Sequence, residues 1–145
     1  MNFIEEELYK DIIRSIPILC VDIIVKVNEK FLLLKRSQQP LKGEWWLPGG
    51  RVQLSETLED AAKRKLKEEL SVSSDKYSKI KAVGIYEDFF YNSSYGNHSY
   101  HTVSHVYEIA LENIEGFVLD KTHNNLALKN ELPKRLLDKM RKIYA

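Results

Sequence analysis

The amino-acid sequence predicts an α/β sandwich, in which a mixed β-sheet lies between helices. Apolar and β-branched runs of strand length occur in the first third of the chain and again in its second half. One stretch with apolar residues at helical spacing lies between these two groups of strands, and another follows the second group. The predicted strands span residues 16–27, 30–36, 79–91 and 102–111, and the predicted helices span residues 57–70 and 130–144. Helices placed in this way can cover both faces of one sheet.

Size and charge restrict the classes of protein to which the chain can belong. Its 145 residues are predicted to form one domain, residues 1–145, which is large enough for a single core. The net charge of +1 at pH 7 gives no reason to expect a nucleic-acid partner or a basic membrane-binding surface. An anionic ligand must therefore bind through a local cluster of positively charged residues.

No segment of the sequence predicts membrane insertion or export. The longest apolar run, residues 16–21, is far shorter than the roughly 20 residues that a spanning helix needs. The acidic start lacks the basic and apolar regions of a secretory signal, so we expect a cytoplasmic protein. The single cysteine, Cys20, excludes an internal disulfide and is predicted to be a small buried hydrophobe.

Short-range patterns predict the remaining elements. Residues 2–14 carry an apolar stripe at helical spacing, which predicts an amphipathic helix that packs on the core or docks on a partner. Asn28 and Glu29 are predicted to form a two-residue turn between the first two strands. Residues 92–99 are predicted to be a loop, and residues 115–126 are predicted to be irregular.

The most informative stretch is residues 43–72, GEWWLPGGRVQLSETLEDAAKRKLKEELSV. Trp45 and Trp46 begin a short predicted strand, and a proline and two glycines end it, because proline lacks an N–H and glycine tolerates positive φ. Ser55 is the predicted N-cap of the helix that follows. Since the two indoles point to opposite sides of the strand, we expect one in the core, while the other could stack on a nucleobase.

Three carboxylates of this stretch, on Glu56, Glu68 and Glu69, can gather beside the glycine backbone. Hard oxygen ligands of this kind suit Mg²⁺ or Mn²⁺ that holds a phosphate. Arg64 would then hold the carboxylates in position. The alternative is an ordinary solvated helix, in which the acids form i,i+4 pairs with neighbouring Lys and Arg residues.

The spacing of these residues resembles the Nudix box, G-x5-E-x7-R-E-U-x-E-E-x-G-U, where U is apolar. The matching positions are Gly50, Glu56, Arg64, Leu66, Glu68, Glu69 and Val72. Lys65 stands where the family has Glu, and Ser71 stands where it has Gly. A longer match, which includes Asp22, Arg36 and the PGGRVQ run at residues 48–53, resembles the GDP-mannose mannosyl hydrolase branch, whose box is itself degenerate. The resemblance implies a Nudix-type α/β/α sandwich.

The resemblance assigns a substrate-binding role to three residues. In the mannosyl hydrolases, an aspartate and arginines at the positions of Asp22, Arg36 and Arg51 contact the sugar and the diphosphate. Arginine suits this role because a planar guanidinium can bind two phosphate oxygens at once. From the residues alone, Asp22 could instead pair with Lys35 or Arg36 on the adjoining strand.

The resemblance also implies a general base and a set of metal ligands. The mannosyl hydrolases carry their base as a histidine in a late loop, at the position of His123, whereas a solvent-exposed histidine with no role is the alternative. The implied ligands of Mg²⁺ (or Mn²⁺) are Glu69, Glu68, Glu56 and the carbonyl of Gly49. Thr122 stands where those enzymes commonly have a metal-binding glutamine, and Asn124 and Asn125 replace acidic residues.

The resulting hypothesis is Mg²⁺-dependent hydrolysis of a nucleoside diphosphate sugar, GDP-mannose or GDP-glucose, with water attacking the anomeric carbon. The implied catalytic residues are His123, Arg36 and Arg51. One alternative is pyrophosphohydrolysis at phosphorus, which the presence of both Glu68 and Glu69 favours and Lys65 disfavours. A non-catalytic nucleotide-sugar sensor is the other. The resemblance further implies a homodimer, in which the apolar stripe of residues 3–13 crosses to the second subunit.

Overall fold

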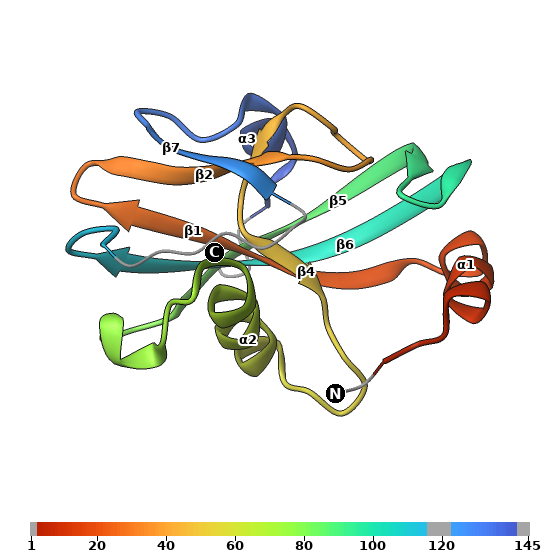
Figure 1. Cartoon of the computed structure of the whole chain (residues 1–145), viewed down its shortest axis with the longest axis horizontal. Helices are drawn as coiled ribbons and strands as arrows, with labels where there is room; N and C mark the ends of the chain where they lie inside the picture. The colour runs from red at the N-terminus through yellow and green to blue at the C-terminus, as the bar shows by residue number, and fades with distance from the viewer. Residues whose placement is uncertain (1–2, 116–122, 142–145) are drawn as a thin grey trace.

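The computed structural model of the chain describes residues 3–115 and 123–141, apart from the side chains of residues 123–125. It confirms the predicted α/β fold, with a mixed sheet flanked by helices (Figure 1). The helices are α1 (Glu6–Ser15), α2 (Leu58–Leu70), α3 (Lys134–Lys139) and the short 3-10 helix η1 (Ser74–Lys76). The strands are β1 (Ile18–Val27), β2 (Lys30–Arg36), β3 (Trp45–Trp46), β4 (Gly49–Arg51), β5 (Lys81–Ser93), β6 (Gly96–Leu111) and β7 (His123–Lys129). None of the described helices is long and apolar enough to cross a membrane.

Strand β1 is central to the sheet and pairs with β2, β4 and β6. The strand order is β3-β2-β1-β6-β5, with β4 paired to β1 and β7 paired to β2. Strands β1 and β6 run parallel, from Ile18 opposite Thr102 to Val27 opposite Leu111, and the other described pairings are antiparallel. This combination makes the sheet mixed, as the sequence predicts.

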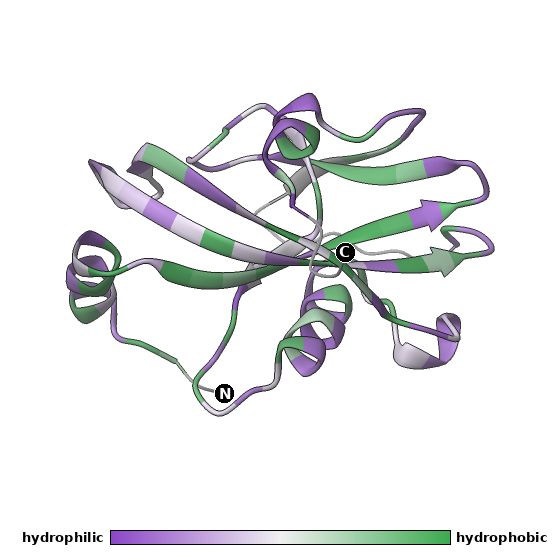
Figure 2. Cartoon of the chain, turned by 180° about the vertical axis from the view of Figure 1, so that it is seen from behind, coloured by the Kyte–Doolittle hydropathy of each residue, from purple (hydrophilic) through white to green (hydrophobic). Residues whose placement is uncertain are grey.

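Two hydrophobic layers hold helices against the sheet, whose apolar strands lie between helices with polar outer faces (Figure 2). On one face, α2 contributes four side chains with no exposed surface, namely Ala61, Ala62, Leu66 and Leu70. On the other face, Leu136 of α3 is equally buried, in a cluster with Ile24 of β1. Because β1 is buried on both faces, its sequence is an almost continuous apolar run.

Helix α1 packs on strand β6 of its own chain. Ile13 is buried in a small cluster with Cys20, which confirms the prediction that this cysteine is a buried hydrophobe, and Tyr9 packs against the same cluster. Burial of the thiol raises the pKa of Cys20 to about 12, so it is protonated at neutral pH. Of the predicted stripe, Phe3 and Leu8 remain exposed.

The caps of α2 differ from the sequence prediction. The N-cap is Thr57, whose hydroxyl accepts a hydrogen bond from the Asp60 N–H at 3.1 Å, and the prediction of Ser55 was wrong. Ser55 instead has a φ of 66° in the loop before the helix, and therefore cannot take the extended backbone of an N-cap. The helix ends at Leu70, and its C-cap Ser71 has a φ of 58° where the Nudix box has glycine.

Three predicted boundaries were wrong because tertiary pairing overrides local pattern. The predicted loop at 92–99 is mostly strand, since β5 and β6 continue as a hairpin to a tight turn before Gly96, which has a φ of 120°. The predicted irregular segment at 115–126 ends in β7, which is held by pairing to β2. Within residues 130–141, the described part of the helix predicted at 130–144, only the six-residue α3 is helical, and Arg141 after it pairs with Ile85.

A buried carboxylate fixes α3 to strand β5. Asp88 has no exposed surface, and it accepts hydrogen bonds from Arg135 Nε at 2.7 Å and from Lys139 Nζ at 2.9 Å. Burial alone would raise the pKa of Asp88, but the hydrogen bonds from the two cations outweigh it, so the pKa lies below its ordinary value. The ion pair therefore contributes stability above about pH 4, and the contribution disappears as the pH falls through the lowered pKa.

We expect Asp88→Asn to lower the free energy of unfolding at pH 7 by about 2–3 kcal/mol, because the substitution removes the charge from hydrogen bonds with two cations. Urea denaturation followed by circular dichroism measures this difference, which should shrink as the pH is lowered below 4. Asp138→Asn is the matched control, since Asp138 forms an exposed pair with Lys134 on the same helix. Equal losses for the two variants would contradict the assigned role of Asp88.

Candidate active site

A cavity of about 170 Å³ opens where strands β1, β2 and β4 meet. It is lined by Asp22 of β1, Arg36 at the end of β2 and Arg51 at the end of β4, together with both glycines of β4. The structure thus brings together the three residues that the sequence predicts to contact the substrate. A carboxyl group and two guanidinium groups in one small cavity suit a ligand that carries both hydroxyl groups and phosphates.

Asp22 is buried at the base of this cavity, with a relative exposure of 7%. Its carboxylate accepts a hydrogen bond from the Tyr86 hydroxyl, and a second hydrogen bond joins it to Ser104. Burial raises the pKa of Asp22 to about 7, against the opposing effects of the Tyr86 hydrogen bond and the nearby Arg36 charge. In the described part of the chain, hydrogen bonds with Tyr86 and Ser104 take the place of the alternative ion pair with the adjoining strand, and burial leaves the carboxyl close to its midpoint at neutral pH.

The register of β4 explains why a glycine follows the proline. Ile23 N–H donates to Pro48 O, and Val52 N–H donates to Leu19 O, so Gly49 faces Asp22 as a non-hydrogen-bonded pair. A Cβ at Gly49 would collide with the Asp22 carboxylate and with a backbone oxygen of β1. In such a pair the N–H and C=O of Gly49 both point away from β1, and the N–H donates to Glu69 at 3.3 Å.

Each arginine of the cavity is held by a contact that the sequence does not indicate. Arg36 Nε donates to the Pro40 carbonyl at 2.7 Å, which fixes the guanidinium at the end of β2, beside the cavity. The guanidinium of Arg51 lies 5.5 Å from the centre of the Tyr9 ring. Because Tyr9 also lines the cavity, α1 forms part of the site within the same chain.

Arg64 of α2 links Glu56, which precedes the helix, and Glu68 to β4. Its Nε and Nη2 donate to the two oxygens of Glu56 at 2.6 and 3.0 Å, and its Nη1 donates to Glu68 at 3.1 Å. Nη2 also donates to the Arg51 carbonyl at 2.9 Å. Hydrogen bonds from Arg64 outweigh partial burial and lower the pKa of Glu56. Arg64 thus contacts two of the three carboxylates that it is predicted to hold, whereas Glu69 contacts Lys65 and the Gly49 N–H.

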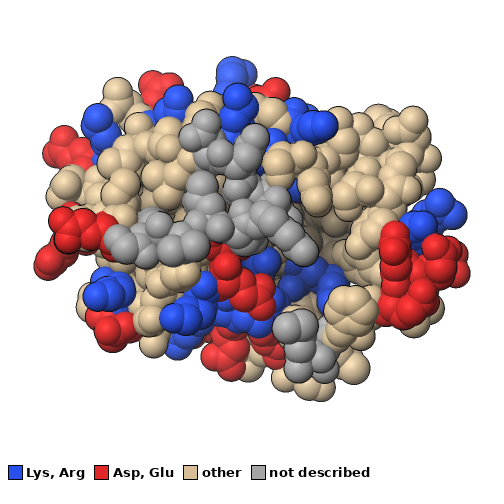
Figure 3. All heavy atoms as spheres, in the orientation of Figure 1, with Lys and Arg blue, Asp and Glu red and all other residues tan. Residues whose placement is uncertain are grey.

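Glu69 is the most buried acid of the helix, with a relative exposure of 2%. Its carboxylate contacts the Lys65 ammonium at 3.1 Å, and Glu68 contacts the same ammonium at 3.4 Å. Burial alone would lower the pKa of Lys65, but the Glu69 and Glu68 carboxylates outweigh it and raise the pKa, so the amine is charged. Acidic and basic side chains accordingly intermingle over α2, and neither sign dominates that face (Figure 3).

The structure places His123 at the start of β7, opposite Arg36 of β2, and not within an irregular loop. This pairing brings the backbone of His123 to the same end of β2 as the cavity. Thr122 lies outside the described residues, as do the side chains of His123 and the two asparagines that follow it.

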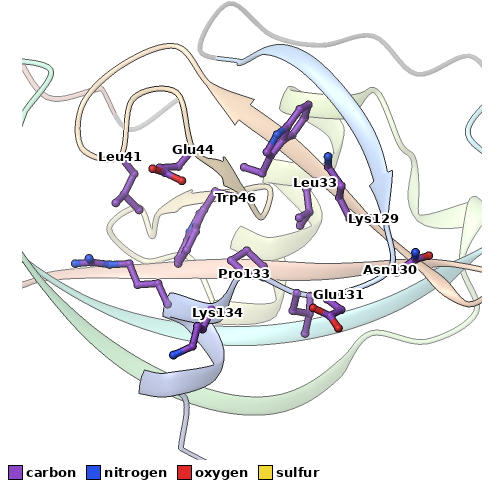
Figure 4. Close-up of a pocket in the computed structure, with 12 residues that line it drawn as sticks. Leu33, Leu41, Glu44, Trp46, Lys129, Asn130, Glu131, Pro133 and Lys134 are labelled. Carbon is purple, nitrogen blue, oxygen red and sulfur yellow. The ribbon is translucent and has the colours of Figure 1, made fainter.

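A larger groove of about 770 Å³ adjoins the cavity, with which it shares Leu41 and Trp46. It lies between strand β3 and the segment that leads into α3, and Leu41, Trp46 and Pro133 face the same hollow (Figure 4). Trp46 is buried, which confirms that one indole belongs to the core. Trp45 is half-buried in the groove wall, with the Lys129 ammonium 4.7 Å from the centre of its ring.

The fold and this site define an α/β domain in which a helix with both acidic and basic side chains packs behind a glycine strand. A NUDIX domain profile matches residues 17–140, and the chain belongs to this family. It is 32% identical over 124 residues to the low-salt glycan biosynthesis protein Agl8 of Haloferax volcanii, a match that covers 85% of this chain and 77% of the relative.

Two further matches are more limited. An ADP-ribose pyrophosphatase of Methanocaldococcus jannaschii is 47% identical over 53 residues, which cover 37% of this chain and 31% of the relative. The NUDIX domain of Shewanella oneidensis NrtR, solved in complex with ADP ribose, superposes with a TM-score of 0.62 at 21% identity and covers 88% of this chain and 83% of that one. The structural match supports the fold.

Nudix hydrolases generally use divalent metals such as Mg²⁺ or Mn²⁺. The residues present fit one such ion. The carboxylates of Glu68 and Glu69 both contact the Lys65 ammonium, so the same oxygens can bind another cation, and the Gly49 carbonyl points away from β1 beside them. Glu56 is separated from this position by Arg64, which engages both of its oxygens. In the described part of the chain no three His, Cys, Asp or Glu side chains converge as ligands.

Proposed function

We propose that the chain is a metal-dependent hydrolase of nucleoside diphosphate sugars, which transfers the glycosyl group to water and releases the nucleoside diphosphate. GDP-mannose and GDP-glucose are the leading substrates. The observation that carries the proposal is the convergence of Asp22, Arg36 and Arg51 in one cavity beside Glu69. Such a cavity can bind a diphosphate through its arginines and a sugar through its carboxyl group.

In this mechanism the two arginines stabilise the charge that develops on the departing diphosphate. Asp22, with a pKa of about 7, orients a sugar hydroxyl as a hydrogen-bond partner. His123 removes the proton of the attacking water, from a position opposite Arg36 in the sheet. Glu69, Glu68 and the Gly49 carbonyl would hold the divalent ion, which supplies Lewis-acid stabilisation of the diphosphate oxygens.

Two features favour attack at carbon over attack at phosphorus. Lys65 places a positive charge between Glu68 and Glu69, where the Nudix box has a further acid, so the cluster offers one carboxylate fewer to metal ions. The Haloferax relative is named for glycan biosynthesis, which agrees with a sugar substrate.

Pyrophosphohydrolysis is the second candidate. It is favoured by the presence of both Glu68 and Glu69 and by the local match to an ADP-ribose pyrophosphatase. A catalytically inactive nucleotide-sugar sensor is the third, and the ADP-ribose complex of the NrtR NUDIX domain is consistent with simple binding of such a ligand.

Product analysis on a panel of nucleotide sugars separates the three functions. The panel includes GDP-mannose, GDP-glucose and ADP-ribose, with Mg²⁺ or Mn²⁺, and products are separated by anion exchange. From GDP-mannose or GDP-glucose we expect free sugar and GDP, whereas ADP-ribose, whose diphosphate is not joined to an anomeric carbon, should not be cleaved in this way. A nucleoside monophosphate with a sugar phosphate would assign pyrophosphohydrolysis, and binding without turnover across the panel would assign a sensor.

We further propose a homodimer that uses the exposed apolar residues near the N-terminus. Phe3 and Leu8 are 82% and 55% exposed. Replacing both with serine is expected to shift the protein from dimer to monomer in light scattering at micromolar concentration. Leu137→Ser, which alters an exposed leucine on α3, should leave the dimer intact. A monomeric wild-type protein at that concentration would contradict the proposal.

A further inference from the structure

The side chain of Lys65 lies between α2 and strand β4. Its ammonium is 3.1 Å from Glu69 and 3.4 Å from Glu68, and the side chain is 16% exposed. A Cβ at Gly50 would lie 2.8 Å from the Lys65 Cε, so the lysine side chain fits there because Gly50 has no side chain. The lysine is therefore packed into the site and is not a mobile surface group.

The burial of Glu69 explains this arrangement. A carboxylate with 2% exposure needs a nearby positive charge, because an uncompensated buried charge is strongly destabilising. Helix preference does not supply the reason, since Lys four residues before Glu is the less favourable order on an isolated helix. Arg64 is directed instead to Glu56, Glu68 and the Arg51 carbonyl.

The ammonium occupies the same position that the carboxylates offer to a divalent ion. Both cations cannot sit there at once, because they would compete for the same oxygens of Glu69 and Glu68 and would repel each other at close range. Binding of a metal ion must therefore break the Lys65–Glu69 contact and move the ammonium aside.

We propose that Lys65 is a tethered counter-ion of the metal site, which holds the site together without metal and which a divalent ion must displace. Lys65 thereby weakens metal binding and makes occupancy depend on the free metal concentration. The inference concerns the same site as the proposed function and rests on it only in placing the ion at Glu69.

Metal binding in the absence of substrate tests this inference. Lys65→Met removes the charge and keeps an unbranched apolar chain, and Lys63→Met is the matched control, since Lys63 pairs with Glu59 on the exposed side of the same helix. We expect Lys65→Met to bind Mn²⁺ at least tenfold more tightly than Lys63→Met, as measured by electron paramagnetic resonance titration. Without metal its melting temperature should fall, and saturating Mn²⁺ should restore it.

Equal or weaker Mn²⁺ affinity in Lys65→Met would overturn the inference. If that variant does not fold, Lys65→Gln provides the same comparison with a polar chain of similar reach. Failure of the proposed function is seen separately, because tighter Mn²⁺ binding without any nucleotide-sugar turnover would leave the role of Lys65 standing and remove the hydrolase assignment.

Discussion

Replacing Glu69 with glutamine is expected to lower kcat by at least about 100-fold, while the fold is retained. Glu69 is the buried carboxylate beside the glycine strand and the proposed principal metal ligand. The substitution removes ligand charge and leaves the shape almost unchanged. Lewis-acid stabilisation contributes several kcal/mol to such reactions, and each 1.4 kcal/mol corresponds to about a tenfold change in rate.

Steady-state kinetics over a range of Mg²⁺ concentrations measures the effect of this substitution. Glu59→Gln is the control, because Glu59 is an exposed acid of the same helix that pairs with Lys63. Circular dichroism should show that both variants are folded. Wild-type turnover by Glu69→Gln at low Mg²⁺ would remove Glu69 from the metal site.

The second large effect is expected for His123→Gln. If water attacks the anomeric carbon, its proton acceptor must lie on the side of the sugar away from the diphosphate, and the start of β7, opposite Arg36, can provide that position. A well-placed general base contributes about 10²–10⁴ in rate. We therefore expect kcat to fall by a factor in that range, with little change in KM.

The pH dependence of the variant separates two titrating groups. An ordinary histidine titrates near pH 6.5, and Asp22 has a pKa of about 7, so both can shape the acid limb of the wild-type profile. Loss of the acid limb in His123→Gln would assign it to the histidine, whereas a retained limb would belong to Asp22. His101→Gln alters an exposed pair with Glu87 and should behave as wild type. An unchanged rate in His123→Gln would exclude it as the base.

The parts of the fold that depend on local pattern could be predicted from the sequence. Helix α2 follows from the spacing of Ala61, Leu66 and Leu70, and the end of the preceding strand follows from the Pro-Gly-Gly run. The assembly of Asp22, Arg36 and Arg51 could be anticipated only through family resemblance, because three separate strands carry them.

Contacts between distant segments could not be read from the sequence. Tyr86 reaches Asp22 across 64 residues, and no local signal marks either as the partner of the other. Strand β7 exists because β2 offers it an open edge, which is a property of the assembled sheet. Tyr9 enters the site because α1 folds back over β6, and an amphipathic stripe alone does not distinguish that packing from a subunit contact.

Hydrolysis in ¹⁸O-labelled water is the most direct test of the proposed attack at carbon. With GDP-mannose as substrate and Mg²⁺ present, mass spectrometry of the separated products determines which one has received the oxygen of water. Attack at the anomeric carbon places the label on the sugar and leaves GDP unlabelled, which is the result we predict. Label on a phosphate of either product would contradict the account and assign pyrophosphohydrolysis.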